Sequence, residues 1–412
     1  MLGIYTSIIK VYFLGIKVFS LFNLKAKLFI EGRKNWEKEF GKIFPVNKKI
    51  IWFHCASLGE FEQGRPVMEL FKIENPEYFL LLTFFSPSGF EVRKNYSTAD
   101  AVFYLPIDNK FNAKKFLDIV SPSIVVFVKY EFWFGYISEI NNRNIPLIFI
   151  SCIFRDNHFL FKWYGKWSVK YLKKCKMIFV QNENSFHNLK KLNFANVEIA
   201  KDTRFDRVFE NSKNIEIPTQ IIDWAKNKDI FVFGSTWKED EDLIKKLIEN
   251  LRKTHTNFGF IIVPHEVNDG HIYFTKNLFS DFKLKLFSDN NLADAEIIVV
   301  DKIGLLSILY SMCKIAYVGG GFGSGIHNLL EPAVFGIPLV FGENNSKFEE
   351  AKNLKTIKAG FEINDSESLI SIYTHLLNNY TELKKSGENA KKYVLENTGG
   401  SKQIVNYLNH II

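Results

Sequence analysis

The chain has 412 residues, of which 47% are hydrophobic and 24% charged, a composition typical of folded proteins that excludes a disordered chain. This length favours two domains over a single core. The net charge of +8 permits binding to anionic lipid, nucleic acid or acidic substrates. The four cysteines lack C-x-x-C spacing, which argues against a zinc site or a disulfide framework and favours a reducing cytoplasm.

An apolar run opens the chain. Residues 2–22 are apolar except for Lys10, Lys17 and a few small or hydroxyl residues, and the run is long enough to span a bilayer. The two lysines lie seven positions apart and so share one helical face, as in a helix that lies in the membrane plane. A basic flank follows at residues 25–38 and suits anionic headgroups on the cytoplasmic side. The alternative is a buried packing helix. We expect residues 1–24 to form a membrane-anchor helix, with the rest of the chain in the cytoplasm.

Beyond residue 48 the chain alternates between short apolar runs and charged segments of helical length. The runs predict strands at residues 50–56, 78–84, 101–106, 123–129, 146–151, 176–181 and 197–200. Alternation of this kind is typical of a parallel sheet covered by helices on both faces. We therefore expect a first Rossmann-like domain at residues 48–210.

A polar stretch at residues 202–220 interrupts the alternation, and a second series of strands follows. The predicted strands lie at residues 229–235, 259–264, 296–301, 314–320 and 338–342. The economical fold is α/β, with two doubly wound domains, the second at residues 220–395, and a C-terminal helix at residues 396–412. In such sheets ligands bind at the carboxyl ends of the strands.

A glycine-rich segment at residues 317–342 follows one strand of the second domain. Exposed N–H groups of such a turn, together with a helix start, favour an anion. The spacing matches neither a dinucleotide fingerprint nor a P-loop, so a dinucleotide enzyme is disfavoured. Asn328 and Glu331 lie three apart, which predicts one helical face, where the acid could accept ribose hydroxyls. A purely structural turn is the alternative.

Three other strand ends of the second domain carry polar or flexible residues. Ser235 and Thr236 precede a run of acids, which predicts a helix N-cap. His265 follows Pro264 at the end of a strand, although a lone histidine is more often structural. Residues 302–304 form another turn. Together these strand ends indicate a nucleotide pocket.

The first domain repeats this design with carboxylates. Glu60 follows the first strand through Ser57 and Gly59, a turn at Ser86 to Gly89 follows the second, and Glu131 follows the fourth. A carboxylate at a strand's carboxyl end can act as a general base. Each acid taken alone is more often a first-turn helix charge. Their expected convergence, with Arg204 at the domain junction, favours catalysis.

The sequence resembles the Kdo transferases, glycosyltransferases that use CMP-activated 3-deoxy-D-manno-octulosonic acid (Kdo). The motifs that carry the resemblance are HCASLGE (54–60), SPSG (86–89), YLPID (104–108), YEFW (130–133), FVQNENS (179–185), DTRFDR (202–207), GSTW (234–237) and the glycine-rich segment 319–342. The resemblance covers nearly the whole chain and implies the GT-B fold, with the acceptor on the N-terminal domain and CMP on the C-terminal one.

The resemblance also implies the reaction and its residues. Kdo would pass from CMP-Kdo to a lipid A precursor by an inverting displacement at the inner membrane, with Glu60 as general base and no metal or other cofactor. Glu131 and Arg204 would stabilise the transition state. The implied CMP contacts are Ser235, Thr236, Pro264, His265, Lys302, Ile303, Gly304, Gly323, Ser324, Gly325, Asn328 and Glu331, and the implied acceptor contacts are Ser57, Gly59, Ser86, Ser88 and Gly89.

Some positions depart from the family pattern. Trp237 stands where many members have histidine, Pro264 where an arginine is frequent, and Arg204 where lysine is common. The rival hypotheses are another GT-B transferase that uses a UDP-sugar, and a non-catalytic membrane-tethered binder of sugar or nucleotide. Nucleic acid is disfavoured as a partner because the basic residues are dispersed.

Overall fold

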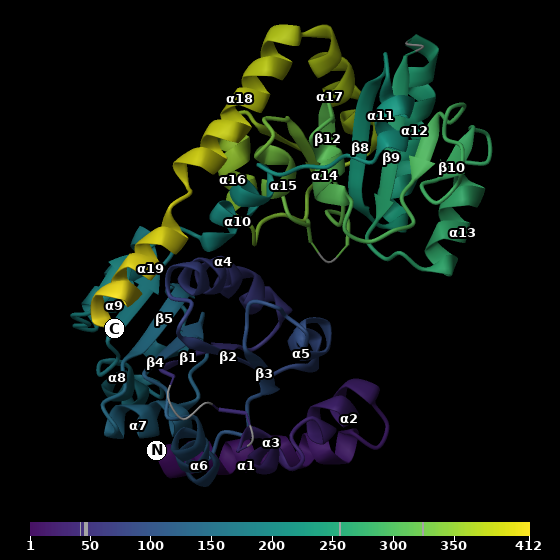
Figure 1. Cartoon of the computed structure of the whole chain (residues 1–412). Helices are drawn as coiled ribbons and strands as arrows, with labels where there is room; N and C mark the ends of the chain where they lie inside the picture. Colours follow the sequence, from purple (N-terminus) through teal and green to yellow (C-terminus); the bar gives the residue numbers. More distant parts are fainter. Residues whose placement is uncertain (42, 45–47, 255–256, 324) are drawn as a thin grey trace. The chain divides into compact units, whose positions relative to one another are not determined.

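The computed structural model describes residues 1–412 apart from 42, 45–47, 255–256 and 324. The chain folds into two compact units, Met1–Asp206 with Thr398–Ile412, and Arg207–Asn397. Each unit contains a sheet of seven parallel strands, and helices connect the successive strands except β10 and β11 (Figure 1). The predicted α/β class with two doubly wound sheets is confirmed.

The sheet of the first unit has the strand order β3-β2-β1-β4-β5-β6-β7. Its strands are β1 (Ile50–Cys55), β2 (Phe79–Phe84), β3 (Ala101–Tyr104), β4 (Ile124–Val128), β5 (Leu147–Cys152), β6 (Met177–Val180) and β7 (Val197–Ile199). The four strands β1, β2, β4 and β5 are buried along their whole length, which explains why they read as continuous apolar runs.

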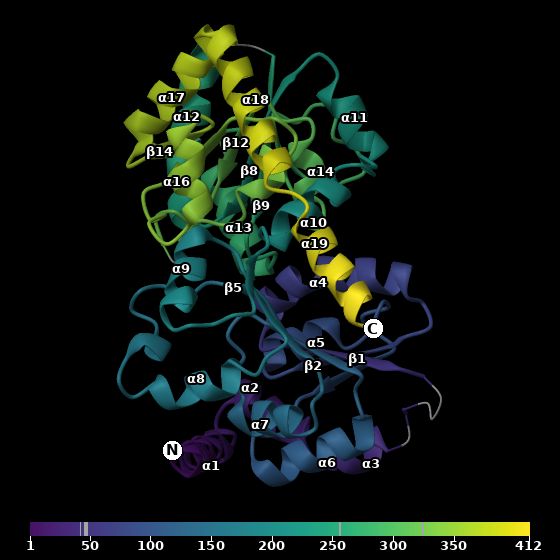
Figure 2. The ribbon, with the colours of Figure 1, turned by 90° about the vertical axis from the view of Figure 1, so that its left-hand side faces the viewer.

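Helices cover both faces of this sheet. They are α1 (Leu2–Phe19), α2 (Leu24–Glu31), α3 (Trp36–Phe40), α4 (Leu58–Glu74), α5 (Pro87–Arg93), α6 (Lys110–Val120), α7 (Phe134–Asn142), the short 3-10 helix η1 (Phe159–Phe161), α8 (Lys166–Leu172), α9 (Glu183–Lys191) and α19 (Gly400–Ile411). The last helix of the chain, α19, packs beside α4 (Figure 2). The helix α10 (Thr203–Asn211) begins in this unit and ends in the second.

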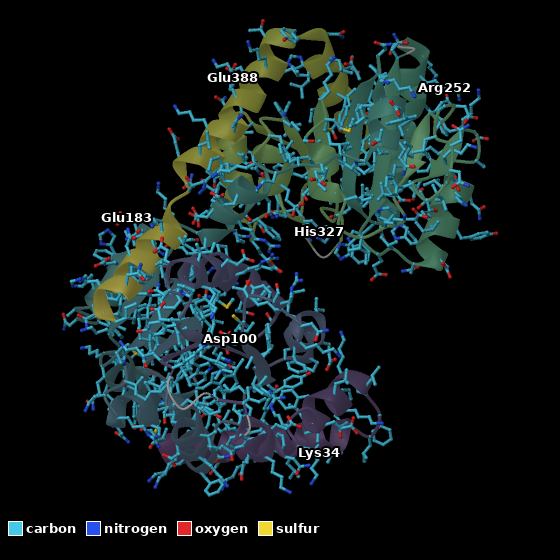
Figure 3. All side chains as sticks on the ribbon, in the orientation of Figure 1. Lys34, Asp100, Glu183, Arg252, His327 and Glu388 are labelled. Atoms are coloured by element: carbon cyan, nitrogen blue, oxygen red, sulfur yellow. The ribbon has the colours of Figure 1, made fainter. Side chains whose placement is uncertain are left out.

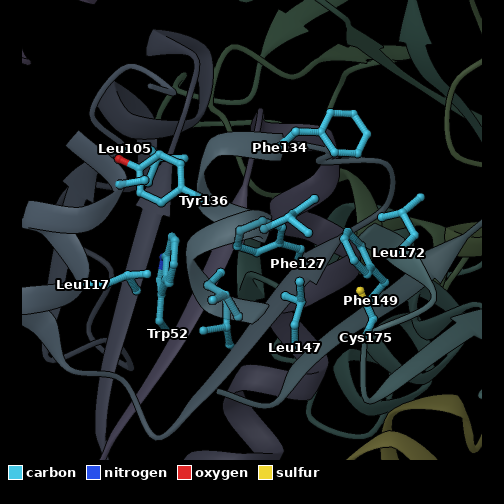
Figure 4. Packing of buried hydrophobic residues seen from close by; sticks show 14 of the residues in the cluster. Trp52, Leu105, Leu117, Phe127, Phe134, Tyr136, Leu147, Phe149, Leu172 and Cys175 are labelled. Atoms are coloured by element: carbon cyan, nitrogen blue, oxygen red, sulfur yellow. The ribbon is translucent and has the colours of Figure 1, made fainter. Parts of the chain in front are cut away.

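Charged side chains such as Lys34 and Glu183 lie on the surface (Figure 3), whereas two apolar cores fill the space between the sheet and its helices. One core joins strand residues such as Trp52 and Phe127 to α3, α6 and α7. Figure 4 shows part of this core, with Leu117 of α6 and Tyr136 of α7 beside Trp52. The other joins the opposite faces of the same strands to α4 and α19. Burial on both faces fixes the strands, and with them the positions of the loops at their carboxyl ends.

The N-terminal helix α1 lies against the first unit along one face. Leu2, Tyr5, Ile9, Phe13 and Ile16 follow a spacing of three or four and are half-buried. The opposite face exposes apolar side chains, including Ile4, Ile8, Val11 and Val18, each at least 57% exposed. Among the described residues, one helix is long and apolar enough to cross a membrane, and that helix is α1.

The second unit has the strand order β10-β11-β9-β8-β12-β13-β14. Its strands are β8 (Asp229–Thr236), β9 (Phe258–Pro264), β10 (Leu284–Leu286), β11 (Ile297–Val299), β12 (Ile315–Val318), β13 (Leu339–Gly342) and β14 (Gly360–Ile363). The further helices are α11 (Thr219–Ala225), α12 (Lys238–Thr254), α13 (Asp269–Leu278), α14 (Leu306–Tyr310), α15 (Leu330–Ala333), α16 (Glu349–Thr356), α17 (Ser366–Asn378) and α18 (Tyr380–Glu396).

All twelve strands predicted from apolar runs are present in the structure. The two edge strands β10 and β14 escaped prediction because they are short and only partly buried, so neither carries a run of apolar residues.

Candidate functional site

Ser57 and Glu60 lie together just beyond the carboxyl end of β1. Ser57 is the N-cap residue of α4 and has an extended backbone, while Glu60 lies in the first turn of that helix. The Ser57 hydroxyl does not cap a backbone N–H but donates to Oε2 of Glu60. Glu60 is half-buried. The turn therefore places the Glu60 carboxylate at the carboxyl ends of the strands, where the Ser57 hydroxyl orients it.

Glu131 lies beyond the carboxyl end of the adjacent strand β4 and is held by an indole. Nε1 of Trp133 donates to Oε2 of Glu131 over 2.7 Å and also lies 3.1 Å from Nε2 of His54. The same Nε2 lies 3.5 Å from Oε2 of Glu131. His54 is fully buried on β1, and its Nδ1 lies 2.8 Å from the hydroxyl of Thr83. This network fixes the position of Glu131 through β1, β2 and β4.

Both carboxylates lie near the buried thiol of Cys55 at the end of β1. Burial raises the pKa of Cys55, and the negative charges of Glu60 and Glu131 raise it further. Glu60 also raises the pKa of Tyr130, although burial is the larger cause. The sequence placed these two acids after the first and the fourth strand, and the structure shows that these strands, β1 and β4, are neighbours in the sheet.

The turn after β2 packs against the turn that carries Ser57. Ser86 caps α5, accepts a hydrogen bond from the N–H of Ser88 and lies 3.0 Å from its hydroxyl oxygen. A Cβ on Gly89 would lie 2.3 Å from the ring of Phe84 and 3.1 Å from the backbone carbon of Ser57, so only glycine fits there. Gly59, in contrast, is exposed, and a Cβ there would meet only the Ser57 hydroxyl oxygen, at a distance of 3.7 Å.

Arg204 forms an ion pair with Asp202 at the start of α10. Its Nε donates to Oδ2 of Asp202 over 2.8 Å, and its backbone N–H donates to Oδ1 over 3.0 Å. The neighbouring Thr203 is buried and donates to the backbone oxygen of Gln63 in α4 over 2.5 Å. The segment with Arg204 is therefore attached to α4, the helix whose first turn carries Glu60.

In the second unit, three rings stack at the carboxyl ends of the strands. The ring centroid of His265 lies 4.8 Å from that of Trp237 and 4.1 Å from that of His327, with interplanar angles of 29° and 21°. Nε1 of Trp237 donates to Nε2 of His327 over 3.0 Å. Figure 3 labels His327 near the lower edge of this unit. Sequence reasoning singled out His265 but missed the roles of Trp237 and His327.

The stack keeps its histidines neutral. Burial lowers the pKa of His327 to about 4, and the nearby His265 contributes to this shift. Burial also lowers the pKa of His265. At neutral pH the stack therefore offers uncharged ring faces and edges, a surface on which a planar base or a polar sugar can pack.

The prediction that Ser235 and Thr236 cap a helix is wrong. The strand β8 continues through Thr236, and α12 begins only at Lys238. Thr236 is fully buried and its hydroxyl donates to Oε1 of Glu241 over 2.8 Å. Ser235 has a left-handed backbone with a φ of 53°. The strand β8 extends to Thr236 because the hydroxyl of Thr236 is bonded to the buried Glu241 and is therefore not used to cap a helix.

Asp240 holds the glycine-rich turn. Its Oδ2 accepts hydrogen bonds from the backbone N–H groups of Gly320 and Trp237 over 2.9 and 2.8 Å, and its Oδ1 accepts one from the hydroxyl of Tyr317 over 2.7 Å. Gly325 has a φ of 120°, which L-residues with a side chain rarely adopt. Gly323 is exposed, and Ser324 lies outside the described residues.

Asn328 and Glu331 are paired, although not on one helical face as predicted. The helix α15 contains only Leu330–Ala333 and has Leu329 as its N-cap residue, so Asn328 lies outside it and accepts from the N–H of Leu330 over 3.1 Å. Nδ2 of Asn328 donates to Oε1 of Glu331 over 3.0 Å. Burial raises the pKa of Glu331, while this hydrogen bond and the charge of Arg207 act in the opposite direction.

The remaining predicted positions lie in two other loops of this unit. Pro264 ends β9, directly before the stacked His265. Lys302, Ile303 and Gly304 form an exposed turn after β11, in which Ile303 is 90% exposed and Gly304 has a φ of 95°. The structure records no hydrogen bond between this turn and the stacked rings among the described residues.

Two units, each with a doubly wound parallel sheet, and polar residues at the strand ends define a GT-B-type protein. The fold is similar to UDP-GlcNAc 2-epimerase from Neisseria meningitidis, with a TM-score of 0.63 and 15% identity over 88% of this chain and all of that one. It is also similar to MurG from Acinetobacter baumannii, with a TM-score of 0.56 and 13% identity over 88% and 99%. At these identities the likeness concerns the fold alone.

Sequence comparison identifies the family. Residues 34–207 match the sequence model of the family described as 3-deoxy-D-manno-octulosonic-acid transferase. The 3-deoxy-D-manno-octulosonic acid transferase of Aquifex aeolicus is 30% identical over 343 residues, which are 82% of this chain and 88% of that protein. The chain belongs to the Kdo transferase family and is a glycosyltransferase, as its motifs indicated.

Proposed function

We propose that this protein transfers Kdo from CMP-Kdo to the lipid A precursor, with inversion at the anomeric carbon and with Glu60 as the general base. Membership of the Kdo transferase family supports the transfer of Kdo. The observation that carries the role of Glu60 is its place at the carboxyl end of β1, oriented by the Ser57 hydroxyl, with Glu131 beyond the end of the adjacent strand β4.

In the proposed reaction, Glu60 accepts the proton of an acceptor sugar hydroxyl as its oxygen attacks the anomeric carbon of Kdo. A new carbon–oxygen bond forms while the bond between Kdo and the CMP phosphate breaks, and CMP leaves as an anion. Arg204 offsets the charge that develops on the leaving group. Because Glu131 is fixed by Trp133 and His54, it supplies a stationary charge near the reacting centre.

The second unit is proposed to bind CMP. Its neutral ring stack offers a packing surface, and the Asn328–Glu331 pair offers acceptors for ribose hydroxyls. The backbone N–H groups of Gly319, Gly320, Gly323 and Gly325 already donate to acceptors within this unit, so these four groups do not form the anion site that the sequence led us to expect. The proposed CMP contacts remain Ser235, Pro264, His265, Lys302, Ile303, Gly304, Gly323, Ser324, Gly325, Asn328 and Glu331, with Thr236 acting through the backbone because its hydroxyl is bonded to Glu241. The proposed acceptor contacts are Ser57, Gly59, Ser86 and Ser88, while Gly89 serves the packing of this surface.

We also propose that α1 anchors the protein in the plane of the inner membrane, with both units on the cytoplasmic side. A helix that crosses a bilayer presents every face to lipid or to other membrane segments. In contrast, α1 keeps one face on the first unit and exposes a second, apolar face opposite to it. Lys10 and Lys17 are exposed and can reach headgroups from the flank of such a helix.

The central test is the variant Glu60→Gln, which keeps the shape of the side chain but cannot accept a proton. We expect its kcat with CMP-Kdo and lipid A precursor to fall by about 10²–10⁴-fold, with CMP binding unchanged. Glu62→Gln is the matched control, since Glu62 lies in the same helix but pairs with Arg93 over 3.0 Å. Mass spectrometry of the lipid product reports transfer. Equal rates for the parent and Glu60→Gln would rule out the base, and turnover with UDP-sugars alone would overturn the donor.

A further inference from the structure

Asp108 is a buried carboxylate that joins three separate elements of the first unit. It follows β3, is 2% exposed and accepts three hydrogen bonds. Oδ2 accepts from the hydroxyl of Tyr5 in α1 over 2.6 Å and from the N–H of Gly135 over 3.0 Å, and Oδ1 accepts from the N–H of Tyr136 over 3.0 Å. The two N–H groups belong to the first turn of α7, so Asp108 caps that helix from a distant part of the chain.

The fit of Asp108 against α7 is close. A Cβ on Gly135 would lie 2.2 Å from Oδ1 of Asp108, so the carboxylate occupies the space that a side chain would take. Burial raises the pKa of Asp108, whereas its three donors favour the ionised form. A negative charge at the positive end of a helix is stabilising, and it holds the first turn in place.

This first turn directly follows the residues that hold Glu131. Trp133 is the N-cap residue of α7, and its indole donates to Glu131. The ring of Trp133 also packs on that of Phe85, with centroids 4.4 Å apart. A shift of the start of α7 therefore moves Trp133, and with it the donor that fixes Glu131.

On the other side, Asp108 contacts the helix whose outer face is exposed and apolar. Tyr5 lies on the inner face of α1, where its ring packs edge-on against Phe134 with centroids 5.4 Å apart and lies 6.1 Å from Trp167. Tyr5 thus connects α1 both to the carboxylate of Asp108 and to the first residue of α7. The contact lies beneath the face that carries Ile4, Ile8 and Val11.

We propose that Asp108 is a positioning residue that couples α1 to Glu131. Docking of α1 on an anionic membrane holds Tyr5 against Asp108, which fixes the first turn of α7 and, through Trp133, the carboxylate of Glu131. The coupling depends on the proposed function in one respect, namely that Glu131 takes part in the transfer of Kdo. The physical link between α1 and α7 stands apart from the reaction.

The test compares Tyr5→Phe with Tyr12→Phe in the full chain. Tyr5→Phe removes the hydroxyl that reaches Asp108 and keeps the ring packing, while Tyr12→Phe removes the same oxygen from a tyrosine of the same helix that is 51% exposed. Backbone hydrogen exchange of residues 131–137 is measured with and without phosphatidylglycerol vesicles. We expect the vesicles to slow this exchange in the parent and in Tyr12→Phe, and Tyr5→Phe to exchange about tenfold faster than either on vesicles.

Kinetics supply the second readout. We expect Tyr5→Phe to lower kcat about three- to tenfold with the KM for CMP-Kdo unchanged, and Asp108→Asn to lower it further, because an amide cannot accept at both oxygen positions. Equal exchange and equal kcat in Tyr5→Phe and Tyr12→Phe would overturn the coupling, as would a loss confined to the KM for the donor. Because exchange needs no substrate, absence of Kdo transfer by the parent would refute the proposed function and leave the exchange result to decide the coupling.

Discussion

Buried carboxylates at the strand ends determine the local geometry of both units. Asp108 and Asp240 each accept three hydrogen bonds, two of them from backbone N–H groups. Glu241 is fully buried and is bonded to Thr236, Thr275 and His271. Since a buried charge is unfavourable without such donors, each carboxylate and its turn stabilise one another. These acids hold the backbone in place, whereas Glu60 and Glu131 are only half-buried.

At the same scale, His327 predicts a pH dependence of stability. Its pKa in the folded chain is about 4, against 6.5 for an ordinary histidine. Between these values the unfolded chain binds a proton that the folded chain does not, so the free energy of unfolding falls as the pH is lowered from 6.5 towards 4. The slope from one such group is at most about 1.4 kcal/mol per pH unit, and solvent screening reduces it here because His327 is partly exposed.

Urea unfolding at pH 7, 6 and 5 measures this slope in the parent and in His327→Gln. We expect the variant to lose less stability than the parent over this range, because it has removed a group whose protonation favours the unfolded chain. Burial shifts the pKa of His265 in the same direction, so some slope persists in the variant. Parallel pH profiles for the two proteins would contradict the prediction.

At the scale of elements, strands could be predicted from the sequence and turns could not. The run of residues 50–56 predicts β1 because a strand buried on both faces needs consecutive apolar side chains. The start of α12 was misplaced because the apparent cap at Thr236 is bonded to Glu241, a tertiary contact that no local pattern reveals. The sequence also placed Asn328 in a helix, whereas α15 begins only at Leu330. The reason is again a tertiary contact, because Asp240 holds the glycine-rich backbone that precedes this helix.

For the candidate site, the sequence predicted the two acids but not the residues that hold them. Glu60 and Glu131 follow predicted strands that neighbour each other in the sheet, so their approach follows from topology. The partners of these acids were not predictable, since Trp133 reaches Glu131 only through the turn before α7. The stack of Trp237, His265 and His327 joins three loops that are distant in the sequence. The sequence pointed only to His265, which follows a predicted strand, and to Trp237, as a departure from the pattern that the resemblance implies.

The turn that Asp240 holds gives a prediction for an element. Asp240→Asn removes one of two acceptor oxygens and places an amide against backbone donors, so we expect the free energy of unfolding to fall by about 1–3 kcal/mol. Because Gly320 and Trp237 lose their common acceptor, we also expect CMP to bind about tenfold more weakly. Urea unfolding and calorimetric titration with CMP measure the two effects. Glu239→Gln, an exposed acid in the same helical turn, is the control, and identical behaviour of the two variants would refute the role of Asp240.

At the scale of the whole molecule, the first unit is built from both ends of the chain. The chain leaves this unit after Asp206 and returns to it at Thr398. Ile404, Val405 and Leu408 of α19 are fully buried in its core, and Lys402 pairs with Glu74 over 2.5 Å. At the other end, α1 packs on the same unit through Tyr5. The first unit therefore carries both the N-terminal helix and the carboxylates, which places the proposed membrane contact and the proposed acceptor site in one rigid framework.

Membrane binding by this framework is tested on the outer face of α1. Ile8→Asp combined with Val11→Asp introduces two charges at positions 61% and 70% exposed, where the fold does not require apolar side chains. We expect co-sedimentation with phosphatidylglycerol vesicles to fall at least tenfold while the unfolding of the first unit is unchanged, because a charge inserted among acyl chains is costly. Ile73→Asp, at a side chain 76% exposed on α4, should bind like the parent. If the double variant bound vesicles as well as the parent, the outer face of α1 would be excluded as the membrane contact. Measuring binding at raised salt separates the contribution of Lys10 and Lys17 from that of the apolar side chains, because salt screens only the charge attraction.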